Sequence, residues 1–445
     1  MATDNLHVIV GLGVTGLSCA RYLAQKNVPF AVTDTRSSPP CLEEFKKLFP
    51  QVPLSLGQLD EVLLNQACQI IISPGVSLQH PAIARQLARG VPIIGDIELF
   101  ALGVKVPLIA ITGTNAKSTV TTLVGEMAQE AGIKVQVGGN LGIPALDLLN
   151  KKENELFVLE LSSFQLETTV SLTPQVATIL NVTPDHMDRY ATLEDYCAIK
   201  QRVYSNCQVA VFNRDDSSTY CGGPYQKKLS FTLEQPRADE FGLLKKKDEL
   251  FLAFEDQALL STRELPILGR HYQANALAAL AVGYGYGLSF EPMLRTLIRF
   301  KGLPHRCQLV RERNGVFWYN DSKGTNVGAA LAAIEGLGNV IEGKLILIAG
   351  GVGKNADFSP LVVPIEKYVK SVVLIGDAAP VLAAVLGDRV EVNFAKSMEE
   401  AVAVADKIAV PGDSVLLSPA CASLDMFNNF EHRGQVFTQI VWGLG

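Results

Sequence analysis

The sequence lacks the features that would place the protein in a membrane or on a nucleic acid. No apolar run reaches the roughly 18 residues needed to span a bilayer. Basic residues are not in excess, since 39 Lys and Arg face 45 Asp and Glu for a net charge of −6, which disfavours nucleic acid or an anionic membrane as the main partner. A local basic pocket could still bind a phosphorylated small molecule. No basic leader precedes the strand expected from His7, so we expect no secretory signal.

Cysteine is present, but never as a Cys-x-x-Cys pair. The eight cysteines are spread along the chain, which is typical of reduced thiols and disfavours a disulfide framework or a structural zinc site. The sequence also has no short-period repeat and no low-complexity tract. We therefore expect a globular cytoplasmic protein.

The pattern that is present is an alternation of strand-like and helical segments. With 445 residues, 48% of them apolar, the chain should hold about three domains. Alternation of this kind predicts parallel sheets covered by helices, the α/β class. We predict an N-terminal Rossmann-like domain over 1–94, a central P-loop ATPase-like domain with a parallel sheet over 95–300, and a C-terminal Rossmann-like α/β domain over 301–445. Hairpins are expected within 226–256.

The expected strands and helices can be placed on the sequence. The strands are His7–Val10, Phe30–Thr33, Ile70–Ile72, Val91–Ile94, Leu108–Thr112, Glu155–Leu159, Val176–Leu180, Val209–Phe212, Lys344–Ile348, Ser371–Ile375 and Ser414–Leu417. The helices are Leu17–Gln25, Pro81–Ala88, Val120–Glu130, Asp377–Leu386 and Met398–Ile408.

The most informative stretch is a strand, a loop of small residues and then Lys-Ser-Thr at the start of a helix. In this order, backbone N–H groups and the positive end of the helix dipole face a triphosphate, while a hydroxyl can ligate Mg²⁺. The loop is shorter than the usual motif, so an ordinary strand–turn–helix connection is the alternative. The candidate ATP-binding residues are Gly113, Thr114, Asn115, Ala116, Lys117, Ser118 and Thr119.

Ala116 stands where a glycine normally precedes the lysine of such a loop. A methyl group is tolerable there at negative φ and costly at positive φ. We expect the loop to work as it stands, with only a modest gain from Ala116→Gly.

A second glycine-rich turn follows the first expected strand. Gly11, Gly13 and Gly16 open a helix, and Asp34 ends the next strand. This spacing is typical of dinucleotide binding, although any doubly wound domain can hold such a turn. A redox NAD site would need a partner for hydride chemistry, and nothing else in the sequence supplies one.

Three further groups follow strands in the central block. Glu160 ends an apolar strand near the phosphate loop, where an acid commonly ligates Mg²⁺; a solvated strand end is the alternative. His186 lies in a loop rich in Asp and Arg and could ligate a second Mg²⁺ or bind phosphate, but a single histidine is more often structural. Lys200, judged from its helical surroundings alone, looks like an exposed lysine without a special role.

In the third block, three polar loops follow strands. Arg306 could stabilise charge on a transferring phosphoryl group, and Asp321 could accept from ribose hydroxyls or a lysine. A glycine turn then carries Lys354, and small polar residues surround Ser423. Loops at the carboxyl edge of one sheet form a site by the open-sheet rule, although each could be an ordinary loop.

Taken in order, these motifs resemble the Mur ligase family from Val10 to the C-terminus. The resemblance implies ATP-dependent joining of D-glutamate to UDP-N-acetylmuramoyl-L-alanine in cytoplasmic peptidoglycan precursor synthesis. It further implies an acyl phosphate and a tetrahedral intermediate, two Mg²⁺ ions, and a monomer without nucleic-acid or membrane partners. The segments that carry it are Gly95–Phe100, Thr112–Thr119, Gly138–Asn140, Leu159–Leu166, Asp185–Tyr190, Leu303–Arg306, Asp321–Lys323 and Ser418–Asp425.

The resemblance also implies roles for individual residues. Lys200 falls where the family has a lysine carbamylated by CO₂. The implied Mg²⁺ ligands are this carbamate, Glu160, His186 and Ser118 or Thr119. The implied catalytic set is Lys117, Glu160, His186 and Lys200. The UDP substrate would contact Val14, Thr15, Asp34, Thr35, Arg36, Ser73, Gly75, Asn140 and His186. ATP would also contact Asn275, Arg306, Asp321 and Lys323, and D-glutamate would contact Thr325, Lys354, Ser423, Leu424 and Phe430.

Three alternatives stay open from the sequence. A folylpolyglutamate synthase or another Mur ligase would share the ATP site. The glycine turn after the first strand alone would also fit a Rossmann oxidoreductase. A non-catalytic nucleotide-binding regulator would bind ATP without turnover, which intact Lys117, Glu160, His186 and Lys200 argue against.

Overall fold

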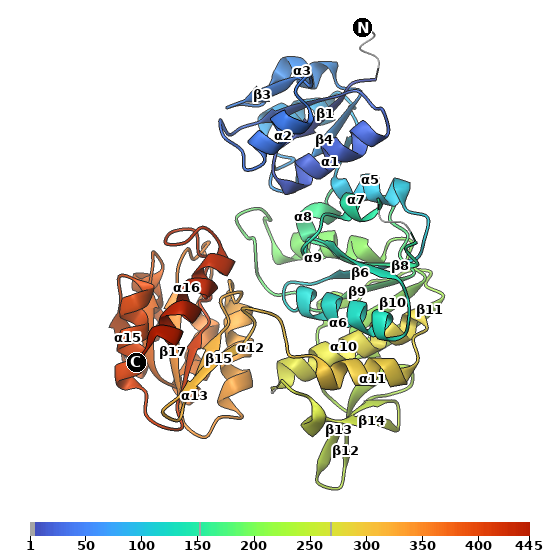
Figure 1. The fold of residues 1–445 in the computed structure, drawn as a ribbon. Coiled ribbons are helices and arrows are strands. Elements are labelled where there is room, and N and C mark those ends of the chain that lie inside the picture. The colour runs from blue at the N-terminus through green and yellow to red at the C-terminus, as the bar shows by residue number, and fades with distance from the viewer. Residues whose placement is uncertain (1–4, 151–152, 268) are drawn as a thin grey trace.

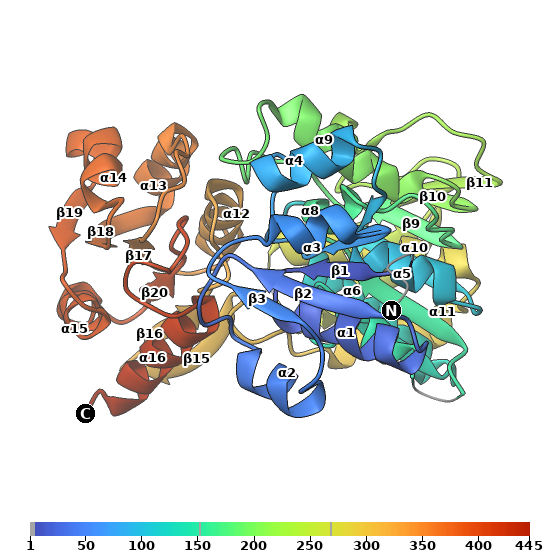
Figure 2. The same ribbon diagram turned by 90° about the horizontal axis from the view of Figure 1, so that it is seen from above.

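The protein is described here by a computed structural model that covers residues 5–150, 153–267 and 269–445. The strands of this described part form three sheets, built in turn from residues 7–94, 108–261 and 308–417. In Figure 1 the first sheet, with its helices, lies above the second, and both Figures 1 and 2 show the third sheet to one side of these two. The predicted α/β class is confirmed. We propose the expected boundaries after residues 94 and 300 as domain limits, and use "N-terminal", "central" and "C-terminal domain" in that sense.

The N-terminal sheet is wholly parallel, in the order β3-β2-β1-β4-β5. Its middle strands are buried because continuous apolar runs meet helices on both faces. Its elements are β1 (His7–Val10), α1 (Val14–Gln25), β2 (Phe30–Asp34), α2 (Leu42–Leu48), β3 (Leu54–Leu56), α3 (Glu61–Gln66), β4 (Gln69–Ile72), α4 (Pro81–Ala88) and β5 (Ile93–Ile94).

The central sheet runs in the order β14-β13-β12-β11-β10-β9-β6-β8-β7. The sheet is parallel from β7 to β12, whereas β12, β13 and β14 pair as antiparallel hairpins. The β12–β13 hairpin lies within 226–256, where hairpins were predicted, and β14 lies just beyond that stretch. Its elements are α5 (Asp96–Gly103), β6 (Leu108–Thr112), α6 (Lys117–Glu130), β7 (Val135–Gly139), α7 (Ala145–Leu148), β8 (Leu156–Glu160), α8 (Ser163–Leu166), β9 (Val176–Ile179), α9 (Leu193–Gln201), β10 (Val209–Asn213), β11 (Lys227–Phe231), β12 (Glu240–Lys246), β13 (Glu249–Phe254), β14 (Gln257–Ser261), α10 (Arg270–Tyr286) and α11 (Phe290–Arg299).

The C-terminal sheet runs in the order β15-β16-β20-β17-β18-β19, with only its edge strand β15 antiparallel among the described strands. Its elements are β15 (Gln308–Arg313), β16 (Val316–Asn320), α12 (Val327–Gly338), β17 (Leu345–Gly350), α13 (Val362–Tyr368), β18 (Val369–Ile375), α14 (Ala379–Leu386), β19 (Glu391–Phe394), α15 (Met398–Ile408), β20 (Ser414–Leu417) and α16 (Phe430–Gly443).

Several predicted elements need correction at their ends. The phosphate-loop helix α6 begins at Lys117 rather than Val120, and β8 includes Glu160 instead of stopping before it. The short edge strands β3 and β19 were not predicted, because three or four half-exposed residues give little hydrophobic signal. None of the helices in the described residues combines the length and apolar character of a membrane span.

The apolar cores show how the domains are joined. One cluster runs from Ile9 and Leu17 in the N-terminal domain through Phe100 to Leu159 in the central domain. The two C-terminal clusters, by contrast, hold no residue from before Cys307 among those described. The first two domains therefore share a core, whereas the third meets them through Leu303, which packs on the central core, and through the contact of α12 with α10.

Candidate active site

The site is formed by loops at the carboxyl ends of neighbouring parallel strands. In the central sheet, β9, β6 and β8 are adjacent, so the loops after them meet at one edge. The same holds for β2, β1 and β4 in the N-terminal sheet and for β16, β20 and β17 in the C-terminal sheet. Sites form at such edges in open α/β sheets.

The phosphate loop is held from below by the loop after β9. The Asn115 N–H donates to Asn181 Oδ1 at 2.8 Å, and the Thr114 hydroxyl contacts the Thr183 carbonyl at 3.1 Å. Lys117 folds back and donates to the carbonyls of Gly113 and Thr114, both at 2.8 Å. Burial lowers the pKa of the Lys117 ammonium.

Ala116 precedes helix α6 with φ at +66°. This is the costly one of the two cases that the sequence left open, because a Cβ in the left-handed region costs about 1–2 kcal/mol. The loop is thus strained at this residue.

Lys200 is not the exposed lysine that its helical surroundings suggested. Its side chain is 1% exposed, donates to the Gly113 carbonyl at 2.9 Å and lies 4.5 Å from the centre of the Tyr196 ring. Burial lowers the pKa of its ammonium well below the usual value, and the nearby Lys117 lowers it further. The prediction from local pattern was wrong because α9 turns this face towards the phosphate loop rather than towards solvent.

Glu160 is likewise buried rather than a solvated strand end. Its Oε1 accepts from Asn140 Nδ2 at 2.7 Å, whereas its buried Oε2 has no hydrogen-bond partner among the described residues. A buried carboxylate oxygen without a partner is costly unless something binds it. The geometry therefore fits a bound cation or a polar ligand at this atom.

His186 lies at a strained corner beside Asp185. Its φ is +57°, its N–H donates to Asp185 Oδ1 at 2.9 Å, and its ring packs on Phe164. Burial lowers the pKa of the His186 imidazole despite the neighbouring carboxylate. A neutral imidazole can ligate a metal or accept a hydrogen bond.

These groups surround one cavity of about 300 Å³, which we call the lysine cavity. Loops from all three domains border it, because Pro74 comes from the first and Thr325 from the third. Its lining includes the whole implied catalytic set together with Thr114, Asn115, Ala116, Ser118, Asn140, Asp185, Tyr196, Arg306, Lys323, Asn326 and Lys354.

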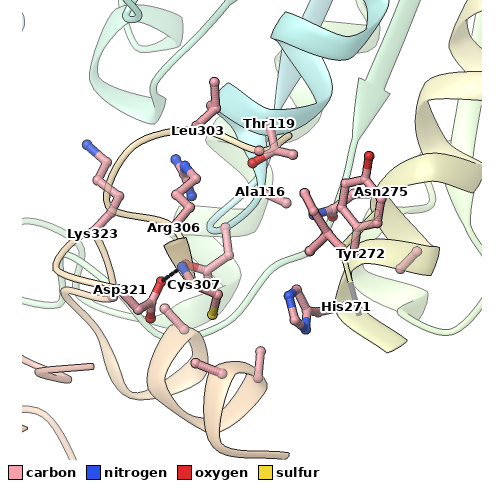
Figure 3. Close-up of a pocket in the computed structure, with 18 of the residues that line it drawn as sticks. Ala116, Thr119, His271, Tyr272, Asn275, Leu303, Arg306, Cys307, Asp321 and Lys323 are labelled. Atoms are coloured by element: carbon pink, nitrogen blue, oxygen red, sulfur yellow. Dashed lines mark hydrogen bonds between the residues drawn. The ribbon is translucent and has the colours of Figure 1, made fainter. Parts of the chain in front are cut away.

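A second cavity of about 190 Å³, the His271 cavity, adjoins the lysine cavity through Asn115, Ala116, Arg306 and Lys323 and is drawn in Figure 3. Figure 3 shows Arg306 and Lys323 on one side, with Asn275 and other α10 residues on the opposite side. Seven expected ATP residues line it, namely Asn115, Ala116, Thr119, Asn275, Arg306, Asp321 and Lys323. His271, Tyr272, Ile267 and Cys307 also line it and were not predicted, since no motif marks them.

Two of the unpredicted residues that line the His271 cavity carry polar atoms that lack a hydrogen-bond partner among the described residues. These atoms are the buried His271 Nδ1 and the buried Tyr272 hydroxyl. A buried polar atom without a partner is costly unless something binds it.

Charge in the His271 cavity is strongly affected by burial. Burial lowers the pKa of Lys323 to about 8. Burial raises the pKa of Asp321 to about 6, even though its carboxylate accepts from the Ser418 hydroxyl at 2.7 Å. Arg306 donates to the Ser118 hydroxyl at 2.9 Å, so a C-terminal-domain guanidinium reaches the start of α6.

A third cavity of about 590 Å³, the N-terminal cavity, adjoins the lysine cavity through Pro74 and Asn140. The glycine turn forms its floor, and a Cβ on Gly16 would lie 1.9 Å from the Gly11 carbonyl oxygen, so only glycine fits there. Eight of the nine expected UDP-substrate residues line it, namely Val14, Thr15, Asp34, Thr35, Arg36, Ser73, Gly75 and Asn140. The ninth, His186, lines the lysine cavity.

Asp34 ends β2 beside the N-terminal cavity and is paired with donors of the protein itself. Its carboxylate already accepts from the Leu12 N–H at 2.6 Å and from the Arg36 side chain at 2.9 and 2.7 Å. Burial raises its pKa, but the bonds from Arg36 and Leu12 lower it by more. In this state Asp34 positions Arg36 at the cavity.

The residues expected to bind the amino acid are only partly brought together. Thr325 and Lys354 line the lysine cavity, and Lys354 Nζ lies 3.7 Å from Asp185 Oδ1. Ser423, Leu424 and Phe430 are not among the residues that line it, and Leu424 is 72% exposed. Phe430 packs instead beneath Lys323, whose Nζ is 3.6 Å from the ring centre.

Three α/β domains border one cavity beside a phosphate-type loop, which is the arrangement of a multidomain nucleotide-binding protein. Family models narrow the class: the MurD-like N-terminal domain of Mur ligases matches residues 5–95, the Mur ligase middle domain matches 111–283, and the Mur ligase glutamate ligase domain matches 305–421. The chain belongs to the Mur ligase family and is a ligase. This membership argues against the oxidoreductase alternative.

Relatives and solved structures agree with this family. The chain is 54% identical to the UDP-N-acetylmuramoylalanine--D-glutamate ligases of Pseudomonas putida and Coxiella burnetii, over 100% of this chain and 99% or 100% of theirs. MurF ligase from Thermotoga maritima, solved in complex with ADP, matches with a TM-score of 0.63 at 16% identity over 99% of both chains. MurC from the same organism matches with a TM-score of 0.62 at 18% identity over 99% of both chains. These structural likenesses show the shared fold.

Proposed function

We propose that this protein uses ATP to join D-glutamate to UDP-N-acetylmuramoyl-L-alanine in the cytoplasmic synthesis of peptidoglycan precursors. The observation that most strongly supports this proposal is the lysine cavity. Loops of all three domains meet there, between the N-terminal cavity and the His271 cavity. The names of the relatives that are more than 50% identical over the whole chain support the choice of substrates.

The two outer cavities suit the two nucleotides. The N-terminal cavity would hold the UDP part of one substrate, with Arg36 at its pyrophosphate, and the loop of Pro74 would lead the muramoyl-alanine arm into the lysine cavity. The His271 cavity would hold the ATP base beside Tyr272 and Asn275, with the triphosphate towards Lys117. The reacting carboxylate and the γ-phosphate would then meet between Lys117 and Lys200.

The chemistry follows from the charges around this point. The alanyl carboxylate attacks the γ-phosphorus and releases ADP, and the D-glutamate amine attacks the acyl phosphate to give the amide and phosphate. Lys117, Arg306 and Lys323 would neutralise charge on the transferring group. Thr325, Lys354, Ser423, Leu424 and Phe430 stay proposed contacts of D-glutamate, with Lys354 pairing with a carboxylate.

The residues present fit Mg²⁺ and a lysine carbamate. Glu160 Oε2 has no partner among the described residues, and burial lowers the pKa of the His186 imidazole, so both can ligate a cation together with the hydroxyls of Ser118 or Thr119. The buried Lys200 amine, with its lowered pKa, suits reaction with CO₂, which gives a carbamate and releases a proton. Two bound Mg²⁺ ions would supply Lewis acidity at the phosphoryl oxygens.

The test is phosphate release from Mg-ATP with UDP-N-acetylmuramoyl-L-alanine and, in parallel, D-Glu, L-Glu, L-Lys, meso-diaminopimelate or no amino acid. Release with D-Glu alone is the expected result. Release with another amino acid would assign the chain to a sister reaction of the family. No release in any reaction would contradict ligase activity on this substrate.

The strain at Ala116 predicts a stability gain without a large kinetic one. Ala116→Gly should raise the free energy of unfolding by about 1 kcal/mol, because glycine accepts φ at +66°. The KM for ATP should change by less than about threefold, since the loop is already held by Asn181 and Thr183. Urea unfolding and ATP kinetics measure both. Asn27→Gly, at φ +54° and away from the cavities, is the matched control; a large fall in the KM for ATP would show that strain impairs the loop.

The lowered pKa of Lys323 predicts a pH effect on ATP capture. Burial, Arg306 and Lys117 lower the pKa of Lys323 to about 8. Glu160 and Glu431 raise it, but by less. Because only the protonated form attracts ATP, kcat/KM for ATP should fall by about tenfold between pH 7 and pH 9. Lys323→Arg keeps its charge over this range and should flatten the profile. Parallel profiles for the two proteins would contradict the assignment to Lys323.

A further inference from the structure

The C-terminal domain is attached to the rest of the protein by polar contacts and by a small apolar contact, in which Leu303 packs on the central core and α12 meets α10. Its apolar clusters hold no described residue from before Cys307. Side-chain contacts across the boundary are made by Arg306 to Ser118, Lys354 to Asp185, and Asn326 to both Asn115 and Asp185. A cavity of about 470 Å³ separates the two surfaces next to these contacts. Seating of this domain therefore depends on these few polar side chains together with the contact of α12 with α10.

Asn326 is the one of these residues whose orientation is fixed at both ends. Its Oδ1 caps helix α12 by accepting from the Ala329 N–H at 2.8 Å. Its Nδ2 must then face the central domain, where it donates to Asn115 Oδ1 at 3.2 Å and to Asp185 Oδ2 at 3.1 Å. With 8% of its surface exposed, the amide has little water to replace these partners.

Both acceptors, Asn115 and Asp185, line the lysine cavity. Asn115 lies in the phosphate loop, where its own Nδ2 contacts Thr183 Oγ1 at 3.4 Å. Asp185 accepts from the His186 N–H at 2.9 Å and faces Lys354. One amide on the C-terminal domain thus holds the loop for the nucleotide and the corner that carries His186.

We propose that Asn326 is a positioning residue that couples seating of the C-terminal domain to the order of the phosphate loop. The inference rests on the proposed ATP-dependent function. The cap fixes the Asn326 amide at the start of α12. Its two donated hydrogen bonds form only when the C-terminal domain is seated, that is, when it contacts the central domain as in this structure. ATP binding and seating therefore favour each other.

The experiment separates the capping role from the donating role. In Asn326→Ser the hydroxyl still caps α12 but cannot donate to Asn115 and Asp185 together. We expect the KM for ATP to rise about tenfold, which corresponds to about 1.4 kcal/mol. The KM for the UDP substrate should rise by much less, because eight of its nine expected contacts line the N-terminal cavity and only His186 lies at the corner that Asn326 holds. Small-angle scattering of the unliganded variant should give a larger radius of gyration than wild type.

Asn326→Asp also keeps the cap but places a carboxylate against Asp185, so it should raise the KM for ATP more than Asn326→Ser does. Combining it with Asp185→Asn restores a donor and an acceptor with exchanged positions and should recover part of that loss. Ser397→Ala removes the cap of α15, away from the boundary, and should lower the melting temperature without changing either KM.

The outcomes are distinguishable. An Asn326→Ser variant with wild-type KM for ATP and wild-type scattering would overturn the proposal, as would an equal rise in both KM values or a lower melting temperature alone. Failure of the proposed function would show itself differently, as absent ATP turnover in the wild-type protein, and scattering would still report on the seating of the domain.

Discussion

Replacing Lys200 with methionine is expected to lower kcat by at least about 10³-fold. Methionine has nearly the shape of the lysine stem, so it fills the buried site beside Tyr196 without a cavity. It cannot form a carbamate, and the anion proposed to hold Mg²⁺ is lost. Because a buried amine is replaced by an apolar group, the melting temperature should stay level or rise.

Two measurements accompany this variant. Wild-type protein equilibrated with ¹³C-bicarbonate should show a carbamate carbon signal by NMR that Lys200→Met lacks, and phosphate release should weaken in CO₂-depleted buffer. Lys407→Met, an exposed lysine on α15, is the control and should keep full activity. Near-normal turnover by Lys200→Met would make Lys200 a buried structural residue without a catalytic role.

The sequence predicted the parts of the site that local motifs define. The phosphate loop, the glycine turn after β1 and the acid that ends β8 each have a fixed place relative to a strand, and strand positions follow from hydrophobic runs. Adjacent parallel strands then bring the loops together, as seen for β9, β6 and β8.

The remainder depends on contacts between distant segments. Burial of Lys200 is set by the way α9 packs against the phosphate loop, 87 residues away in sequence, and no helical period reveals it. His271 and Tyr272 enter their cavity because α10 crosses the sheet beside α12. Asn326 looks like an ordinary helix cap until the C-terminal domain is placed against Asn115. The positive φ of Ala116 is also a property of the folded loop, because an alanine in the sequence gives no sign of it.

The second large effect is expected at Glu160. Glu160→Gln keeps an oxygen to accept from Asn140 but puts an amide where the unpartnered Oε2 lies, so the side chain retains its shape and loses its charge. If this atom binds Mg²⁺, kcat should fall by about 10²–10³-fold, and the Mg²⁺ concentration for half-maximal activity should rise. Phosphate release titrated with MgCl₂ at saturating substrates measures both quantities.

A matched buried carboxylate shows whether that effect belongs to the metal. Glu98 is 5% exposed and accepts from the N–H groups of Val170 and Ser171, outside the lining of the three cavities. Glu98→Gln should lower the free energy of unfolding by about 1–3 kcal/mol, because charge-assisted bonds are weakened, yet leave the Mg²⁺ requirement unchanged. The same Mg²⁺ requirement in Glu160→Gln as in wild type would assign Oε2 to another ligand. A higher requirement confined to Glu160→Gln would instead tie the unpartnered oxygen to the cation, because the two substitutions remove the same charge from equally buried sites.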